Sequence, residues 1–203
     1  MLVLNRSDLS RQSLTTLPNV LTYLRMATIP VIVVLLMPPS SELALNFAFL
    51  VFCVASLTDY LDGILARRWN TVTSIGKLLD PLADKLLTTA VLIMLIPYNK
   101  VSGWLVFLIV GREIVITGLR SIAVAHGLII DASRMGKNKM VSQTLGLVFL
   151  LPSLPKLQAT LSLVGTSFLY ISVVLGYISA TDYMLSFYRE AKRRGPPSIS
   201  DES

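Results

Sequence analysis

The chain has 203 residues, of which 53% are hydrophobic and only 15% are charged, and its mean hydropathy is +0.67. Soluble domains typically have about a quarter of their residues charged, so this composition argues against a soluble protein and favours membrane-spanning helices. The net charge is +6, but the basic residues do not gather in patches interleaved with aromatic residues. We therefore expect membrane lipids, and no nucleic acid, as partners.

Six apolar stretches approach the roughly 20 helical residues that a bilayer core of about 30 Å requires. They cover residues 17–37, 43–57 (continuing in helical period into 59–68), 81–96, 104–124, 141–154 and 160–187. This pattern predicts an all-α integral membrane protein with six transmembrane helices joined by short loops. We assign residues 1–18 to an N-terminal juxtamembrane segment that can lie at the membrane interface, residues 19–190 to the six-helix domain, and residues 191–203 to a basic, then polar, disordered tail.

The basic residues predict the orientation of these helices. Arginines and lysines gather before the first helix, between the second and third, between the fourth and fifth, and after the sixth. The opposite loops contain only Lys100 and Lys156. Because positively charged loops stay in the cytoplasm, we expect a multi-pass protein of the cell (inner) membrane with both termini cytoplasmic.

Four aspartates, Asp59, Asp62, Asp80 and Asp84, lie within 26 residues. Helical geometry places the first pair on one face of the second helix and the second pair, four residues apart, on one face of the third. Residues 68–79 are predicted to form a loop, so the two helices form a hairpin with an active site at its cytoplasmic end. Carboxylates this close repel one another unless they are neutralised. Oxygen-only ligands suit Mg²⁺, Mn²⁺ or Ca²⁺, and pairs of such ions assist displacements at phosphorus.

A solvated helix end, in which these acids pair with nearby basic residues such as Arg67 and Lys85, is the structural alternative. Four aligned acids beside a helix that is apolar for fifteen residues favour a functional site instead, because ionisable groups at membrane depth are functional by default. Arg67 is also suited to bind a phosphate, since its guanidinium presents a planar fork of donors.

The motif Asp59-Tyr-Leu-Asp62-Gly63-Ile-Leu-Ala66-Arg67, followed after eight residues by Gly76-Lys-Leu-Leu-Asp80-Pro-Leu-Ala-Asp84, resembles the signature of the CDP-alcohol phosphotransferase family. The six-helix layout of that family also agrees with the chain. The resemblance implies transfer of a phosphatidyl group from CDP-diacylglycerol to an alcohol, with release of CMP. It also implies a homodimer, because members of the family are commonly homodimers.

The same resemblance implies roles for the individual residues of the motif. The four aspartates would hold two divalent ions, Mg²⁺ or Mn²⁺, and Asp84 would also be the general base. The CDP moiety would contact a second set, which is Asp59, Gly63, Ala66, Arg67 and Gly76.

The acceptor is predicted from two other segments. The fourth helix carries Arg112 and Glu113, with Thr117 and Arg120 on the same face as Glu113, and arginines in an apolar span need a partner or an anion. Residues 134–139 form a predicted basic loop that adds Lys137 and Lys139. We therefore predict a pocket for an acceptor that carries a phosphate, lined by Arg112, Thr117, Arg120, Lys137 and Lys139. Interhelical pairing of Arg112 with Glu113, and ordinary positive-inside charge for the two lysines, are the structural alternatives.

These segments, together with residues 17–25, resemble bacterial phosphatidylglycerophosphate synthases, whose acceptor is sn-glycerol 3-phosphate. Inositol phosphate, serine and phosphatidylglycerol stay open as acceptors, although the cations count against serine. The role of Arg25 in the first helix also stays open. A divalent-cation transporter is the non-enzymatic alternative, but it requires polar residues along several helices, whereas the acids gather at one interface. A scaffold protein would not need four aligned acids.

Overall fold

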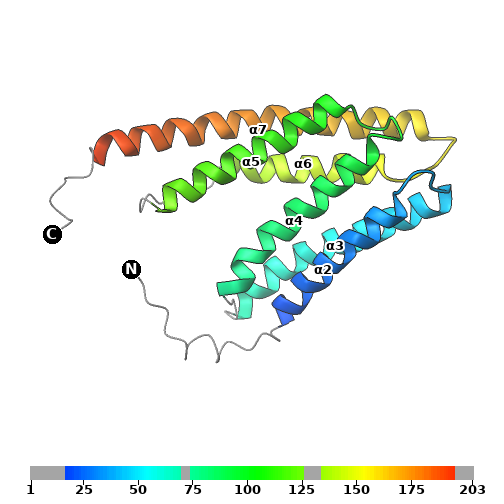
Figure 1. Ribbon diagram of the computed structural model, residues 1–203, viewed down its shortest axis with the longest axis horizontal. Helices are drawn as coiled ribbons and strands as arrows, with labels where there is room; N and C mark the ends of the chain where they lie inside the picture. Colours follow the sequence, from blue (N-terminus) through cyan, green and yellow to red (C-terminus); the bar gives the residue numbers. More distant parts are fainter. Residues whose placement is uncertain (1–16, 70–73, 126–133, 195–203) are drawn as a thin grey trace.

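The computed structural model describes residues 17–69, 74–125 and 134–194, without the side chains of residues 17–21, 59–69, 74–81, 134, 191 and 194. Within these ranges the regular secondary structure is entirely helical, which confirms the prediction of an all-α protein (Figure 1). The helices are α2 (Leu17–Leu35), α3 (Glu42–Trp69), α4 (Ser74–Leu95), α5 (Gly103–Ala125), α6 (Arg134–Leu150) and α7 (Gln158–Arg194).

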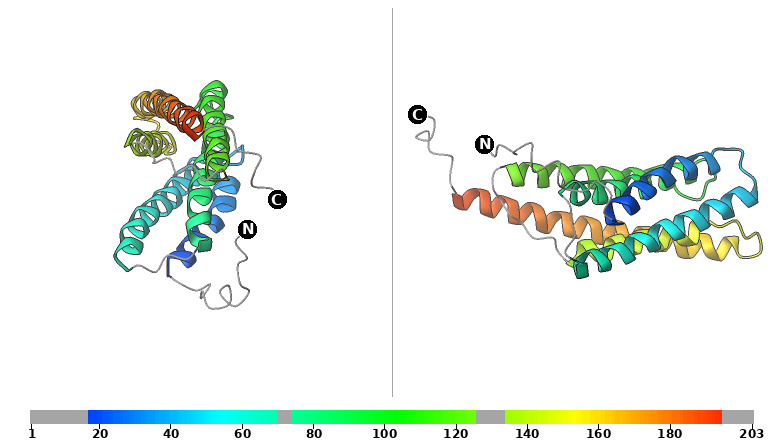
Figure 2. Two further views of the ribbon diagram at one scale, coloured as in Figure 1. Left: turned by 90° about the vertical axis from the view of Figure 1, so that its left-hand side faces the viewer. Right: turned by 90° about the horizontal axis from the view of Figure 1, so that it is seen from below.

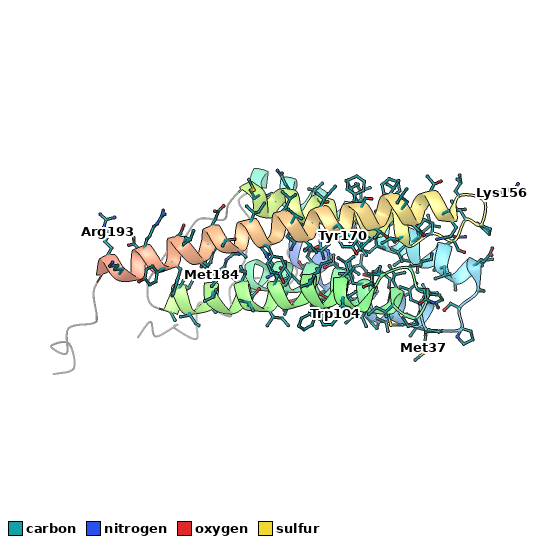
Figure 3. The ribbon with its side chains drawn as sticks, turned by 90° about the horizontal axis from the view of Figure 1, so that it is seen from above. Met37, Trp104, Lys156, Tyr170, Met184 and Arg193 are labelled. Carbon is teal, nitrogen blue, oxygen red and sulfur yellow. The ribbon has the colours of Figure 1, made fainter. Side chains whose placement is uncertain are left out.

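Successive helices run in alternating directions along the molecule (Figure 1). The α2–α3, α4–α5 and α6–α7 connections lie at one end, which we name the outer end, where Met37 and Lys156 are found (Figure 3). The start of α2, the end of α3, the start of α4 and the end of α7 lie toward the opposite end, which we name the inner end (Figure 1), and Arg193 is labelled at the end of α7 (Figure 3). The first three helices diverge from the last three toward the inner end (Figures 1 and 2).

A continuous apolar core joins all six helices. Its members include side chains with no exposed surface from five of them, and α5 adds side chains such as Leu105 and Ile109 that are less than 5% exposed. Many other large apolar side chains on every helix point outward and are exposed. The fully buried members include Ile32 of α2, Phe52 of α3, Leu92 of α4, Leu150 of α6 and Leu169 of α7.

Two glycines bring α6 and α7 into close contact, and these helices lie side by side (Figure 2). A Cβ added to Gly146 would lie 2.8 Å from Leu169 Cδ2 and 3.0 Å from the Gly165 carbonyl oxygen. A Cβ added to Gly165 would lie 2.6 Å from Leu150 Cγ and 2.9 Å from the Gly146 carbonyl oxygen. Small residues at such crossings let helix backbones approach one another, as in membrane helix pairs.

Side chains at the outer end bond to the backbone of neighbouring connections. Asn46 donates from Nδ2 to the Ser153 carbonyl (3.3 Å), and its Oδ1 accepts from the Ser153 backbone N–H (2.8 Å). The Tyr98 hydroxyl donates to the Leu36 carbonyl (3.1 Å). These bonds satisfy backbone groups that follow helix ends, where the last carbonyls have no partner within the helix.

Lys100 makes the corresponding contact between the α4–α5 connection and the end of α6. Its Nζ donates to the carbonyls of Leu151 (3.1 Å) and Pro152 (3.0 Å). Burial lowers the pKa of the Lys100 ammonium below its usual value, because desolvation disfavours the charged form.

Three helix boundaries differ from the sequence prediction. The predicted loop at residues 68–79 is wrong for residues 68, 69 and 74–79, because α3 continues to Trp69 and α4 begins at Ser74. The isoleucine, lysine and leucines of 74–79 are compatible with a helix, and residues 70–73 lie outside the described residues. Residues 134–139 are not a loop but the start of α6, since one glycine costs a helix only about 1 kcal/mol. α6 ends at Leu150, earlier than predicted, because Pro152 cannot continue the hydrogen-bonding pattern.

α7 is the one helix in the described ranges that is long and apolar enough to cross a membrane by length and composition alone. Its stretch Gln158–Glu190 has a mean hydropathy of 1.8 in the most apolar window, of which 22% is buried. α2 and α3 contain shorter apolar stretches, Thr22–Leu35 and Glu42–Thr58. α7 also includes residues 191–194, which the sequence analysis assigned to the tail.

Candidate active site

A cavity of about 820 Å³ lies between α4, α5, α6 and α7, in the inner half of the bundle. It is lined by the middle of α4, by α5 from Arg112 onward, by the first part of α6 and by the later part of α7. The predicted acceptor residues and the predicted general base all line this one cavity: Asp84, Arg112, Thr117, Arg120, Lys137 and Lys139. Residues separated by up to 55 positions in sequence are thus brought together.

The backbone places the four motif aspartates on two consecutive helices. Asp59 and Asp62 lie within α3, and Asp80 and Asp84 lie within α4, with only residues 70–73 between the helices. The Asp84 side chain is half-buried and faces the cavity. The other three side chains fall outside the description, as do those of the predicted CDP-binding residues Gly63, Ala66, Arg67 and Gly76.

The metal site stays a prediction. Among the side chains that the structure describes, no group of three or more histidines, cysteines, aspartates or glutamates is placed to hold an ion. The donor set itself fits the predicted ions, because two helices joined by a short link carry four carboxylates and Asp84 reaches the cavity. Carboxylate oxygens are the ligands that Mg²⁺ and Mn²⁺ prefer.

Three cationic side chains of the cavity form ion pairs with Glu113. Arg112 Nη1 lies 2.9 Å from Glu113 Oε1, and Lys139 Nζ is bonded to the same oxygen. Lys85 Nζ lies 3.8 Å from Oε2 and also donates to Thr117 Oγ1 (2.6 Å). The Arg112 and Lys139 side chains are about nine-tenths buried. The pairing of Arg112 with Glu113, which the sequence analysis offered as the structural alternative, is therefore present inside the predicted pocket.

α7 adds a wall to the cavity that the sequence analysis did not predict. Ser179, Asp182 and Tyr183 line it, and the Arg120 guanidinium lies 5.8 Å from the centroid of the Tyr183 ring, within the range of a cation–π contact. Asp182 is the first acidic residue of α7, in an otherwise apolar and small-residue stretch. That lone acid was the available signal in the sequence. For Lys85, the sequence predicts only pairing with the motif aspartates.

Arg25 lies away from this cavity. Its side chain is only 3% exposed and lines a smaller, mostly apolar cavity of about 280 Å³ between α2 and α3. Thr58, immediately before Asp59, lines the same cavity. Arg25 is therefore close in the fold to the start of the aspartate motif.

Residues 15–178 match the sequence profile of a family described as CDP-alcohol phosphatidyltransferase. The chain belongs to the CDP-alcohol phosphatidyltransferase family. The match includes all four aspartates of the motif and every residue of the predicted acceptor pocket. The family resemblance seen in the motif is thereby confirmed.

Curated members of the CDP-alcohol phosphatidyltransferase family are similar over most of the chain. A relative from Rickettsia bellii is 40% identical over 168 residues, covering 82% of this chain and 92% of its own length. One from Bacillus subtilis is 38% identical over 151 residues, covering 68% and 78%, and one from Salmonella choleraesuis is 37% identical over 140 residues, covering 66% and 76%. All three bear the name CDP-diacylglycerol–glycerol-3-phosphate 3-phosphatidyltransferase.

Proposed function

We propose that this protein transfers the phosphatidyl group of CDP-diacylglycerol to sn-glycerol 3-phosphate, giving phosphatidylglycerophosphate and CMP. The observation that carries the proposal is the single cavity in which Asp84 lies with the cations of α4, α5 and α6. A general base and an anion-binding group in one cavity suit an acceptor that has both a hydroxyl and a phosphate. The names of the similar proteins support the same reaction.

The transfer is a displacement at the phosphorus that carries the diacylglycerol. The acceptor hydroxyl oxygen forms a new bond to this phosphorus, and the bond between the phosphorus and the CMP oxygen breaks. The hydroxyl proton passes to the Asp84 carboxylate, and CMP leaves with the electron pair of the broken bond. Binding the acceptor phosphate beside Asp84 contributes to catalysis by orienting the hydroxyl toward its base and its target.

The residues proposed to hold two divalent ions are Asp59, Asp62, Asp80 and Asp84. Such ions, when bound, would lower the pKa of the acceptor hydroxyl and offset the charge that develops on the pyrophosphate. In the same proposal, the CDP moiety is bound by Asp59, Gly63, Ala66, Arg67 and Gly76. The choice between Mg²⁺ and Mn²⁺ is left to the assay below.

We propose that all six helices span the membrane, with the inner end and both termini on the cytoplasmic side. The clustering of arginines and lysines at that end supports this orientation. The charges within α5 and α6 line a cavity, which is where ionisable groups of membrane helices are expected. Exposed apolar side chains along the outer surface of every helix suit contact with lipid. The homodimer implied by the family stays a prediction.

The same chemistry with another acceptor is the nearest alternative. Inositol phosphate also carries a phosphate and would suit the cations, whereas serine and phosphatidylglycerol lack a phosphate monoester. A divalent-cation transporter would need polar groups at the outer end that continue a path from the cavity. The fully buried apolar side chains of Leu92, Leu95 and Leu150 lie in the core on that side.

The test is a substrate panel with purified protein in lipid or detergent micelles. CDP-diacylglycerol is combined with glycerol 3-phosphate, inositol phosphate, serine or phosphatidylglycerol, and CMP release is measured with Mg²⁺, with Mn²⁺ and with a chelator. We expect metal-dependent release with glycerol 3-phosphate and little with serine. Absence of CMP release with every acceptor, from protein that is folded and binds the donor lipid, would contradict the proposal.

A further inference from the structure

Glu113 gathers three cationic side chains from three helices. Lys85 comes from α4, Arg112 from α5 and Lys139 from α6, and all three form ion pairs with the one carboxylate. We name Lys85, Arg112 and Lys139 the cation trio. Glu113 itself is 15% exposed, so its charge is held in a partly dry environment in which ion pairs are strong.

Two further contacts restrict the trio. Arg112 Nε donates to the Gly176 carbonyl of α7 (3.0 Å), and Lys85 Nζ donates to Thr117 Oγ1 (2.6 Å). A Cβ on Gly176 would lie at 3.5–3.6 Å from Lys139 and Arg112 atoms, so both side chains rest against the α7 backbone. The guanidinium and the lysine stem therefore have little freedom to rearrange.

The net charge of the cation trio together with Glu113 is complementary to that of a phosphate monoester. Three cations and one carboxylate leave two net positive charges, and a phosphate monoester carries about 1.5 to 2 negative charges at pH 7. Arg120 and Lys137 also line the cavity, but Asp84 and Asp182 balance them in formal charge. The charge available for the acceptor is thus that of the trio with Glu113.

We propose that Glu113 is a positioning residue for the acceptor, acting through the cation trio rather than by touching the acceptor. A carboxylate repels a phosphate, so Glu113 cannot bind it directly. Three cations close together also repel one another, and Glu113 offsets that repulsion and holds them at a spacing that a phosphate can bridge. This inference rests on the proposed function, because it concerns the binding of a phosphorylated acceptor.

The first test is Glu113→Gln, which removes the charge and keeps the size of the side chain. We expect the KM for glycerol 3-phosphate to rise about tenfold, as for loss of a charged hydrogen bond. The KM for CDP-diacylglycerol and kcat should change by less than about twofold. An unchanged or lower KM for glycerol 3-phosphate in this variant would overturn the proposal, because added positive charge without loss of position would bind phosphate at least as well.

The second test asks whether loss of Glu113 lowers the KM for glycerol 3-phosphate, instead of raising it, once one cation of the trio is absent. Lys139→Gln removes one cation and leaves Glu113 facing the phosphate with only two partners, so the KM for glycerol 3-phosphate should rise at least tenfold. Adding Glu113→Gln to Lys139→Gln restores two net positive charges and should lower that KM about threefold relative to Lys139→Gln alone. A role limited to structure predicts a further rise in the double variant, and that result would overturn the proposal.

Two controls separate folding from binding. Glu113→Asp keeps the charge on a shorter side chain and should recover most of the affinity that Glu113→Gln loses. Glu42→Gln removes an exposed carboxylate at the start of α3, at the outer end, and should leave both KM values unchanged. If wild-type protein releases CMP with glycerol 3-phosphate but the variants do not show these KM changes, only the proposal for Glu113 is contradicted. If wild-type protein releases no CMP, the proposed function itself is contradicted.

Discussion

At the outer end of the bundle, Asn46, Tyr98 and Lys100 bond to backbone atoms of neighbouring connections. At the inner end, Arg112 and Lys139 bond to another charged side chain, Glu113, beside a cavity. A backbone carbonyl next to a helix end accepts its hydrogen bond whether or not a ligand is present. A charged side chain can instead transfer part of its bonding to a ligand.

The polar groups of the two ends therefore have different roles. Outer-end contacts join connections that follow α2, α4 and α6, so they contribute to stability without facing the cavity. Inner-end charges leave net positive charge beside Asp84, and the role proposed for them is to bind the acceptor phosphate. Substitutions at the outer end should therefore change stability, and substitutions at the inner end should change kinetics.

Asp84→Asn should give the largest loss of activity, which would identify the inner end as the catalytic end. The amide cannot accept the hydroxyl proton, so CMP release should fall by about 10³-fold, in the range found for loss of a general base. Binding of CDP-diacylglycerol and the apparent Tm should stay close to wild type. Turnover near that of wild type would exclude Asp84 as the base.

Gly165→Ala should give the largest effect on stability among these changes. The new Cβ would lie within 2.9 Å of the Gly146 backbone oxygen, which cannot move without shifting α6. We expect a loss of about 1–3 kcal/mol, as for overpacked cores, seen as a lower apparent Tm in detergent. Gly103→Ala is the matched control, since nothing lies within 4 Å of its Cβ position; equal Tm losses in both would contradict the close crossing.

Arg112→Ala and Lys137→Ala compare the effects on acceptor KM of losing a buried and an exposed cation at the inner end. Arg112 is about nine-tenths buried and bonded to Glu113 and Gly176, so its loss should raise the KM for glycerol 3-phosphate by at least about tenfold. Lys137 is exposed, and its loss should raise that KM only about two- to threefold. Unchanged acceptor kinetics in both variants would remove these residues from the acceptor site.

Lys100→Met should give the smallest change, a slight change in stability. Loss of two hydrogen bonds to carbonyls is partly offset because an ammonium no longer has to be desolvated, so we expect a change of less than about 1 kcal/mol and unchanged KM values. Altered acceptor kinetics would contradict the assignment of the outer end to stability.

The lowered pKa of Lys100 adds a pH dependence to this comparison. Unfolding restores the ordinary, higher pKa, so the unfolded chain binds the proton more tightly. The stability of wild type relative to Lys100→Met should therefore rise as the pH rises through the alkaline range between the folded and unfolded pKa values. Apparent Tm values of the two proteins at pH 7 and near pH 10 measure this difference.

The helices were largely predictable, because long apolar runs at helical spacing require a helix whatever their neighbours are. The boundaries of the helices were less predictable. Residues 68, 69 and 74–79 contain a polar and glycine-bearing stretch that is typical of a loop, yet all of them are helical. Their individual propensities differ by less than about 1 kcal/mol, so extension of the flanking helices decides the outcome. The start of α6 at Arg134 has the same explanation.

The helical class, the aspartate motif and the family follow from the sequence alone, because periodicity and motif spacing are local properties of the chain. Only the tertiary structure decided that Asp84, Arg112 and Lys139 share one cavity, that α7 supplies its wall, and that Glu113 is the common partner of Lys85, Arg112 and Lys139. The physical reason is that helix spacing indicates which residues share a face but not which helix that face meets. The contact between faces depends on how all six helices pack, and here α4, α5 and α6 converge on a single carboxylate.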